Sequence, residues 1–256
     1  MKFIILGCGS SMGVPRSDGY FGNCNPNNKK NYRTRCSALL KSNKETILID
    51  TSPDLRQQLL HNKIKVIDKV LYSHMHADQT HGINDLRVFF VKKQKTIPIY
   101  ADNLTKKYLL NTFSYCFSNN SNEYPATLKL NSIHNALFIK DGTKKIPIKP
   151  VKVQHGKVDS ICYIVDKKLA YISDVSNIKK KDLIYFKKVK FLVIDCLWLK
   201  KHPSHLNLTE CLDLVNLLKP KKTILTNLHS DLDYDYLKKI LPKNVVPAHD
   251  GMSVKL

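Results

Sequence analysis

The stretch SHMHADQTHG, residues 73–82, places three histidines and one aspartate within ten positions. His74 and His76 are two residues apart at the end of a predicted strand, so both side chains can face one ion if the chain turns there. Asp78 stands at the start of a predicted helix, and His81 follows three residues later on the same helical face. Neutral imidazoles and a carboxylate suit Zn²⁺, Mn²⁺ or Fe²⁺. The stretch therefore predicts a metal site, whose remaining ligands must come from other parts of the chain.

Short apolar runs on both sides of this stretch predict a chain rich in strands. The predicted strands are residues 2–6, 36–41, 46–50, 69–73, 96–100, 160–165, 169–173, 191–195, 223–227 and 244–248. The predicted helices are residues 53–61, 80–91, 103–115, 207–219 and 233–240. Strands that come first as a meander and are then mixed with helices favour an α/β fold, in which two sheets pack face to face with helices outside. No linker-like composition divides the chain, so we expect residues 1–256 to form a single domain.

Polar residues recur at the ends of the predicted strands. They are Asp50, His74, Asp174, Asp195, Asn227 and His229, and His155 follows a segment of alternating apolar residues. A single aspartate after a strand usually caps a helix or forms a turn, but polar groups at several strand ends are how a rigid scaffold builds a site. A catalytic ion needs about three protein ligands and an open position for water. We therefore expect His155 to join His74 and His76 as a third ligand, and Asp174 to reach toward a second ion.

The basic residues point more to anionic substrates than to nucleic acid. The formal net charge is +21, but only five of the 42 basic residues are arginines. The lysines occur in pairs and triplets that are typical of solvated turns, so most of the excess is interpreted as surface composition. Arginine offers phosphate a planar, bidentate fork that lysine lacks. All five arginines lie in the first 87 residues, near the histidine cluster, which makes them the better candidates for a phosphate contact.

The cysteines and the N-terminus predict a cytoplasmic protein. Seven cysteines are scattered without the spacing of a disulfide framework, which favours free thiols in a reducing compartment. The apolar run at residues 3–6 is too short for a signal-peptide core or a membrane span. We expect no membrane partner, and a homodimer stays open.

Six segments together resemble one branch of a known superfamily. They are ILGCGSSMGVPR (5–16), NYRTRCSALL (31–40), ILIDTSPDLRQQLL (47–60), SHMHADQTHGINDLR (73–87), SHLNLTE (204–210) and LTNLHSDLDYD (225–235). Over nearly its whole length the chain resembles the metallo-β-lactamase superfamily, and within it the branch that contains the phosphoribosyl 1,2-cyclic phosphate phosphodiesterase. The resemblance implies an αββα four-layer sandwich and a cytoplasmic, metal-dependent hydrolase of phosphodiesters.

Carried over to this chain, the resemblance implies a two-ion centre with two departures from the superfamily pattern. The implied ligands of the first ion are His74, His76 and His155. The implied ligands of the second ion are Asp78 and Asp174, of which Asp174 bridges both ions. The pattern has histidines at the positions of Gln79 and Asn227, so both departures remove imidazoles from the same ion.

Two hypotheses account for these departures. In the first, His81 and His229, each two residues further along the chain, rebuild the second site. In the second, the second site is weak, and one ion acts together with hydrogen bonds. The retention of both Asp78 and Asp174 favours the rebuilt site or one with harder ligands, so the cofactor is expected to be one or two ions of zinc or manganese.

The substrate contacts are expected at a loop and at one further histidine. The loop GCGSSMGVPR (7–16) is rich in small residues that can approach a phosphate, with Ser10, Ser11 and Arg16 as the candidate contacts. A tight turn that needs glycine would explain the same composition. The resemblance places His205 beside the leaving group, where a histidine can protonate a departing alkoxide. His205 and Asp78 are the predicted catalytic residues.

The predicted activity is metal-assisted hydrolysis of a small phosphorylated substrate, such as a phosphoribosyl cyclic phosphate or a nucleotide. Three alternatives stay open. A ribonuclease Z-like nuclease is compatible with the charge, although no lysine-rich arm for gripping tRNA is evident. Lactone or thioester hydrolysis uses the same metal chemistry, and a catalytically weakened nucleotide-binding module would fit the altered second site.

Overall fold

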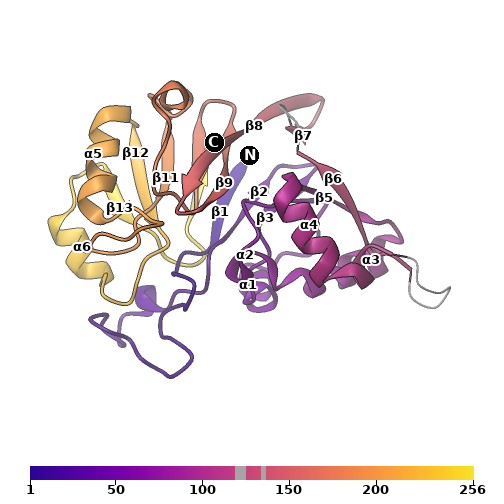
Figure 1. Cartoon of the computed structure of the whole chain (residues 1–256), viewed down its shortest axis with the longest axis horizontal. Helices are drawn as coiled ribbons and strands as arrows, with labels where there is room; N and C mark the ends of the chain where they lie inside the picture. The colour runs from indigo at the N-terminus through magenta and orange to yellow at the C-terminus, as the bar shows by residue number, and fades with distance from the viewer. Residues whose placement is uncertain (119–124, 134–136) are drawn as a thin grey trace.

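The computed structural model describes residues 1–118, 125–133 and 137–256, and these form four layers. Two sheets pack face to face in the middle, and helices cover the outer face of each sheet (Figure 1). This is the αββα sandwich that was expected. Helices α1 to α4 lie on the side of the first sheet, and α5 and α6 lie on the side of the second (Figure 1).

The first sheet is built from the N-terminal half of the chain and the final strand. Its described order is β14 (Ser253–Lys255), β1 (Lys2–Gly7), β2 (Ser37–Lys41), β3 (Thr46–Ile49), β4 (Lys69–Leu71), β5 (Ile97–Ala101) and β6 (Leu128–Ser132). Its helices are α1 (Leu55–His61), α2 (Ala77–Thr80), α3 (Arg87–Lys93) and α4 (Asn103–Thr112). Strands β3 to β6 are parallel, and parallel neighbours need crossover connections, which these helices supply.

The second sheet is built from the C-terminal half. Its described order is β13 (Val245–Pro247), β12 (Lys222–Thr226), β11 (Phe191–Asp195), β10 (Leu169–Ile172), β9 (Val158–Val165), β8 (Lys144–His155) and β7 (Leu137–Asp141). Its helices are α5 (Leu208–Leu218) and α6 (Tyr234–Ile240). The described short 3₁₀ helices are η1 (Lys29–Asn31), η2 (Ile83–Leu86), η3 (Ser114–Cys116) and η4 (Lys180–Tyr185). Because β10 to β13 are parallel, the carboxyl ends of these strands meet at one edge.

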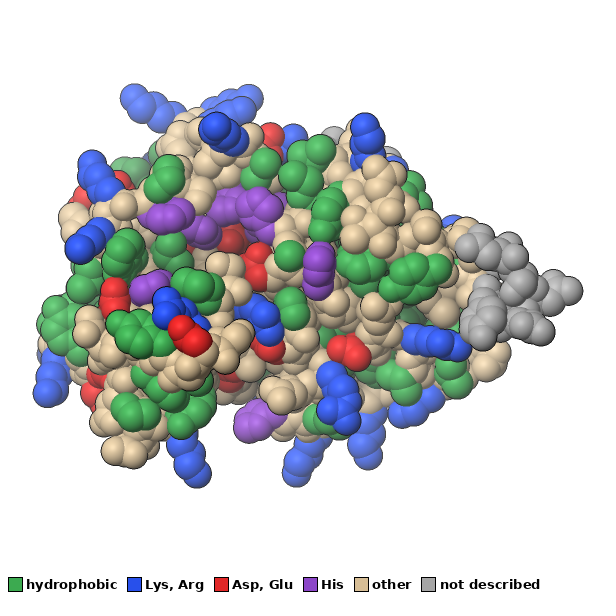
Figure 2. Space-filling model, turned by 60° about the horizontal axis from the view of Figure 1, so that its bottom comes forward, with side chains coloured by type: hydrophobic (Ala, Val, Ile, Leu, Met, Phe, Trp, Pro, Cys, Tyr) green, Lys and Arg blue, Asp and Glu red, His purple; other side chains and the backbone are tan. Residues whose placement is uncertain are grey.

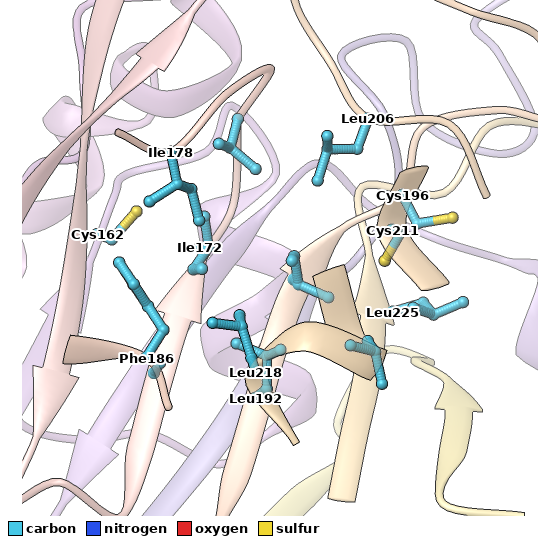
Figure 3. Close-up of a cluster of buried hydrophobic side chains, with 14 of the residues drawn as sticks. Cys162, Ile172, Ile178, Phe186, Leu192, Cys196, Leu206, Cys211, Leu218 and Leu225 are labelled. Carbon is cyan, nitrogen blue, oxygen red and sulfur yellow. The ribbon is translucent and has the colours of Figure 1, made fainter. Parts of the chain in front are cut away.

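Three layers of apolar side chains hold the sandwich together. One lies between the sheets and includes Phe3 and Tyr171, whose ring centroids are 5.4 Å apart. The second lies between the first sheet and its helices. The third packs the second sheet against α5, with Leu218 and Leu225 among its members (Figure 3). All seven cysteines are buried and free, as expected for reduced thiols, and Cys211 packs among the aliphatic side chains of this third layer (Figure 3).

The predicted elements are present, with one helix broken into pieces. The helix predicted at 80–91 is divided into α2, η2 and α3, because the chain turns at Gly82 against Ser52. A Cβ at Gly82 would lie 2.0 Å from the Ser52 carbonyl oxygen, so only glycine fits this approach. The strands β6, β7, β8 and β14 were not predicted. Within the described ranges no helix has the length and apolar character to cross a bilayer.

Candidate metal centre

The loop after β4 carries the first histidines and is fixed from two sides. Asp50, which directly follows β3, accepts the backbone N–H of Ser73 at 2.7 Å. The carbonyl of Ser73 in turn accepts the backbone N–H of Ile161 on β9, at 2.9 Å. Asp50 therefore holds the histidine loop in place from the end of the neighbouring strand. The second bond ties the histidine loop of the first sheet to the second sheet.

Three imidazoles converge at this loop. His76 Nδ1 lies 2.9 Å from His74 Nε2 and 3.3 Å from His155 Nε2. The opposite ring nitrogens have other partners, because His155 Nδ1 donates to the Ser204 carbonyl at 2.7 Å and His74 Nδ1 lies 3.0 Å from Ser73 Oγ. The structure thus brings together the three histidines predicted to hold the first ion.

The three histidines fit one divalent ion. Nitrogens that bind a tetrahedral zinc at its usual bond length are separated by about 3.3 Å, close to the spacing seen here. Burial lowers the pKa of His74 to about 3, which keeps its imidazole neutral and its lone pair free for a metal. Asp174 Oδ2 is buried and has no hydrogen-bond partner among the described residues, as expected of an oxygen reserved for a cation.

Asp174, Asp195 and Asn227 come from the adjacent parallel strands of the second sheet. Asp174 follows β10, Asp195 ends β11 and Asn227 follows β12, so all three reach the same edge. Asp174 forms a second group of converging ligand atoms with His155 and His205. All three strand-end side chains are almost fully buried.

His205 is held by a carboxylate behind it. Its Nδ1–H donates to Asp195 Oδ2 at 2.7 Å, and 15% of its side chain is exposed. Burial by itself would lower the pKa of His205, but the charge and the hydrogen bond of Asp195 outweigh it and raise the pKa to about 9. The ring centroid of His205 lies 4.6 Å from that of His155, so this imidazole with its raised pKa stands beside the three-histidine group.

Gln79 and Asn227, the two departures from the superfamily pattern, both bind the carboxylates of the centre. Gln79 Nε2 donates to Asp78 Oδ2 at 2.9 Å. Asn227 Nδ2 lies 3.3 Å from Asp174 Oδ1 and 3.2 Å from Asp195 Oδ1. Their exposed fractions are 0% and 2%, so neither amide is free to exchange these bonds for water.

His81 does not replace the missing ligand. Its Nε2 lies 2.9 Å from the hydroxyl of Tyr108, and its ring packs edge-on against Phe113. Because α2 ends at Thr80, the chain turns at His81 and directs it to this exposed pair rather than to Asp78. The expectation that His81 rebuilds the second site is therefore corrected.

His229 lines the site without joining the ligand groups. Its ring packs against Trp198 at 5.2 Å between centroids, and its Nδ1 accepts the backbone N–H of Asp231 at 3.2 Å. Within the described parts of the chain, the groups of three converging ligand atoms are the two named above, and His229 belongs to neither. In this structure His229 therefore does not stand with the ligands of a rebuilt second site, the role that the sequence predicted for it.

A cleft of about 270 Å³ opens over the centre, and it receives two of the three predicted substrate contacts. Ser10 and Ser11 line it, together with Trp198, which the sequence had not singled out. Arg16 is not among the lining residues, because it pairs with Asp18 at 2.8 Å and lies over the ring of Tyr20. Figure 2 shows a group of histidine side chains gathered in a hollow, with acidic side chains close by.

A larger cavity lies apart from this chemistry. It has a volume of about 620 Å³ and is lined by Lys29, Lys30 and Arg35 among others. Arg35 is already paired with Asp54, and none of the converging ligands faces this cavity. The smaller cleft is therefore the candidate active site.

Comparison with known proteins finds one matching family and several similar structures. A model of the beta-lactamase superfamily domain matches residues 45–227. A diphosphatase from the PhnP family is 29% identical, with a TM-score of 0.88 over 100% of this chain and 97% of that one. Zinc-bound PqqB of Methylobacterium extorquens is 16% identical, with a TM-score of 0.77 over 100% of both chains. The short form of human tRNase Z is also 16% identical, with a TM-score of 0.70 over 100% of this chain and 99% of its own.

One curated relative is an octanoyltransferase of Porphyromonas gingivalis. It is 29% identical over 258 residues, which cover 98% of this chain and 51% of that protein. The chain thus spans about half the length of the curated relative that it matches. The name of the whole relative therefore does not say what the matching half does.

Proposed function

Because the chain belongs to the beta-lactamase superfamily and is a metal-dependent hydrolase, we propose that it hydrolyses a small phosphodiester, such as a cyclic phosphate or a nucleotide ester. The observation that carries the proposal is the position of His205, which is hydrogen-bonded to Asp195 and lies beside the three-histidine group. Cleavage of a phosphodiester expels an alkoxide, which needs a proton as it leaves. An imidazole held by Asp195 can supply that proton.

The residues of the cleft divide into three roles. His74, His76, His155 and Asp174 would hold a divalent ion. When bound, such an ion makes water more acidic and offsets negative charge on phosphoryl oxygens. Asp78 lines the cleft and can accept a proton from the attacking water. Ser10 Oγ is buried without a described partner at the cleft wall and can donate to a phosphoryl oxygen.

A substrate panel tests the proposal. The purified protein would be loaded with Zn²⁺ or Mn²⁺ and assayed on cyclic phosphodiesters, linear phosphodiesters, lactones, thioesters and a tRNA precursor. We expect the highest kcat/KM on a small phosphodiester. Turnover confined to lactones or thioesters, or to RNA, would contradict the proposal.

Hydrolysis of a diphosphate is a second candidate, favoured by the 29% identity to a diphosphatase. A departing phosphate needs no proton from the enzyme, whereas a departing alkoxide does. Replacing His205 by glutamine should therefore slow diester hydrolysis while sparing diphosphate hydrolysis. The position of His205 against Asp195 is what makes us prefer the diester.

A further inference from the structure

We infer that the side-chain amides of Gln79 and Asn227 take the place of a second ion, so that the centre of this chain holds one divalent cation. The inference rests on the metal-binding part of the proposed function and is independent of which substrate is cleaved. It concerns two carboxylates, Asp78 and Asp174, that in a two-ion centre would be bound by the second cation.

The first step is the bond made by Gln79. Its Nε2 donates to Asp78 Oδ2 at 2.9 Å, so a lone pair that would face a cation is occupied by an N–H group. The backbone of Gln79 is also fixed, because its carbonyl accepts the N–H of Thr51 at 2.8 Å. With none of its surface exposed, the side chain is set in this position by the packing around it.

The second step is the pair of bonds made by Asn227. A side-chain amide carries two N–H groups, and the two carboxylate oxygens near Nδ2 belong to Asp174 and Asp195. Turning the amide over would place its oxygen against these carboxylate oxygens, which is repulsive. Asn227 therefore presents donors to this position, and a donor nitrogen of this kind is not a metal ligand.

The third step is electrostatic. Two carboxylates close together in a buried centre need either a cation or hydrogen-bond donors to offset their charge. Here Gln79 serves Asp78 and Asn227 serves Asp174. The replacement histidines that a second ion would need are not available, because His81 faces Tyr108 and His229 packs on Trp198.

The fourth step concerns the two carboxylate oxygens of Asp174, which have different surroundings. Its Oδ1 is near the Asn227 amide, while its Oδ2 is buried without a partner among the described residues. One oxygen is thus committed to hydrogen bonding and the other is left for a cation. The arrangement suits one ion on the side of the histidines and none on the side of Asp78.

Metal content provides the test. The wild type would be saturated with Zn²⁺, Mn²⁺ or Co²⁺, dialysed and measured by elemental analysis, and Co²⁺ binding would also be followed by its visible absorption. We expect one equivalent with each metal. We expect two equivalents in the double variant Gln79→His with Asn227→His, which restores the two imidazoles.

A matched double variant controls for added histidines. Gln57→His with Asn43→His makes the same two changes at exposed positions outside the cleft and should stay at one equivalent. If the buried double variant does not fold, as judged by circular dichroism, the wild type decides together with His81→Ala and His229→Ala. All three should hold one equivalent.

Several results would overturn the inference. They are two tightly held equivalents in the wild type, a loss of metal in His81→Ala or His229→Ala, and a folded Gln79→His, Asn227→His variant that stays at one equivalent. A wild type that holds one equivalent but cleaves no phosphodiester would refute the proposed function and leave this inference standing. A wild type that binds no metal would refute both.

Discussion

The centre has a histidine half, with His74, His76 and His155, and an amide half, with Gln79 and Asn227. The two halves meet at Asp174 and differ in the hydrogen-bond partners of their polar atoms. On one side, ring nitrogens of His74, His76 and His155 lie within hydrogen-bond distance of one another, and Asp174 Oδ2 is buried without a partner among the described residues. On the other side, the carboxylates of Asp78 and Asp174 each have a nearby amide N–H. Buried polar groups are normally paired, so the free oxygen of Asp174 on the histidine side favours a cation there, whereas the amide N–H groups on the other side already offset the charge of the carboxylates. The difference shows that retained carboxylates alone do not indicate a metal site.

The largest expected effect comes from removing a metal ligand of the histidine half. His76→Ala removes an exposed imidazole and should leave the fold intact, but the ion loses one of its ligands. We expect kcat/KM to fall by about 10³-fold or more, which corresponds to about 4 kcal/mol of transition-state stabilisation. Metal content should fall in parallel. Full activity with a full complement of metal would contradict the assignment of His76.

Removing the proton donor should have the next largest effect. His205→Gln should lower kcat by about 10²-fold on a diester with an alkyl leaving group. The loss should be much smaller with a p-nitrophenyl leaving group, which departs without a proton. An equal loss on both substrates would show that His205 acts in another way than by protonating the leaving oxygen.

The metal-free protein should become less stable as the pH rises. The pKa of His205 is raised from 6.5 to about 9 by the net effect of its surroundings, so its contribution is complete below about pH 6.5 and is lost as the pH passes 9. The loss should amount to about 3 kcal/mol between these limits. Denaturant unfolding of the metal-free protein at several pH values measures it. A profile that is equally steep in His205→Gln would assign the effect to other groups.

A single substitution in the amide half should lower activity less. Gln79→Ala leaves the ligands of the histidine half untouched, so the metal content should stay at one equivalent. Asp78 loses its hydrogen-bond donor, and kcat/KM should fall by about 10-fold, as is typical for groups that orient a catalytic residue. A loss of metal in this variant would mean that the two halves are not separable.

The smallest effect is expected for Arg16→Ala. Arg16 is engaged with Asp18 and Tyr20 and does not line the cleft. We expect KM to change by about threefold at most, because an exposed ion pair contributes little. A change of KM by two orders of magnitude would show that Arg16 swings to the substrate, as the sequence had suggested.

Much of the fold could be predicted because its strands are short apolar runs that end at polar residues. The ten predicted strands and the layered arrangement follow from this pattern. The strands β6 (LKLNS), β7 (LFIKD) and β14 (SVK) could not be found in this way because they are short and contain few apolar residues. Strand β8 was missed because Pro147 and Pro150 interrupt its apolar pattern. The break in the helix at Gly82 depends on a contact with Ser52, thirty residues earlier, which periodicity does not reveal.

The candidate site, too, could be predicted from the sequence only in part. Spacing identified His74 and His76, and strand ends identified Asp174 and Asn227. Spacing could not show where His81 points, because its partner Tyr108 lies on α4, 27 residues further along the chain. The role of Gln79 also required three dimensions, since a glutamine beside an aspartate can serve as a ligand, a donor or a surface residue.

Anomalous diffraction from crystals soaked in Mn²⁺ or Zn²⁺ would test the central claim most directly. The account predicts one anomalous peak, bound by His74, His76 and His155, with the amides of Gln79 and Asn227 still donating to the carboxylates. A second peak bound by Asp78 and Asp174, with either amide displaced, would contradict it.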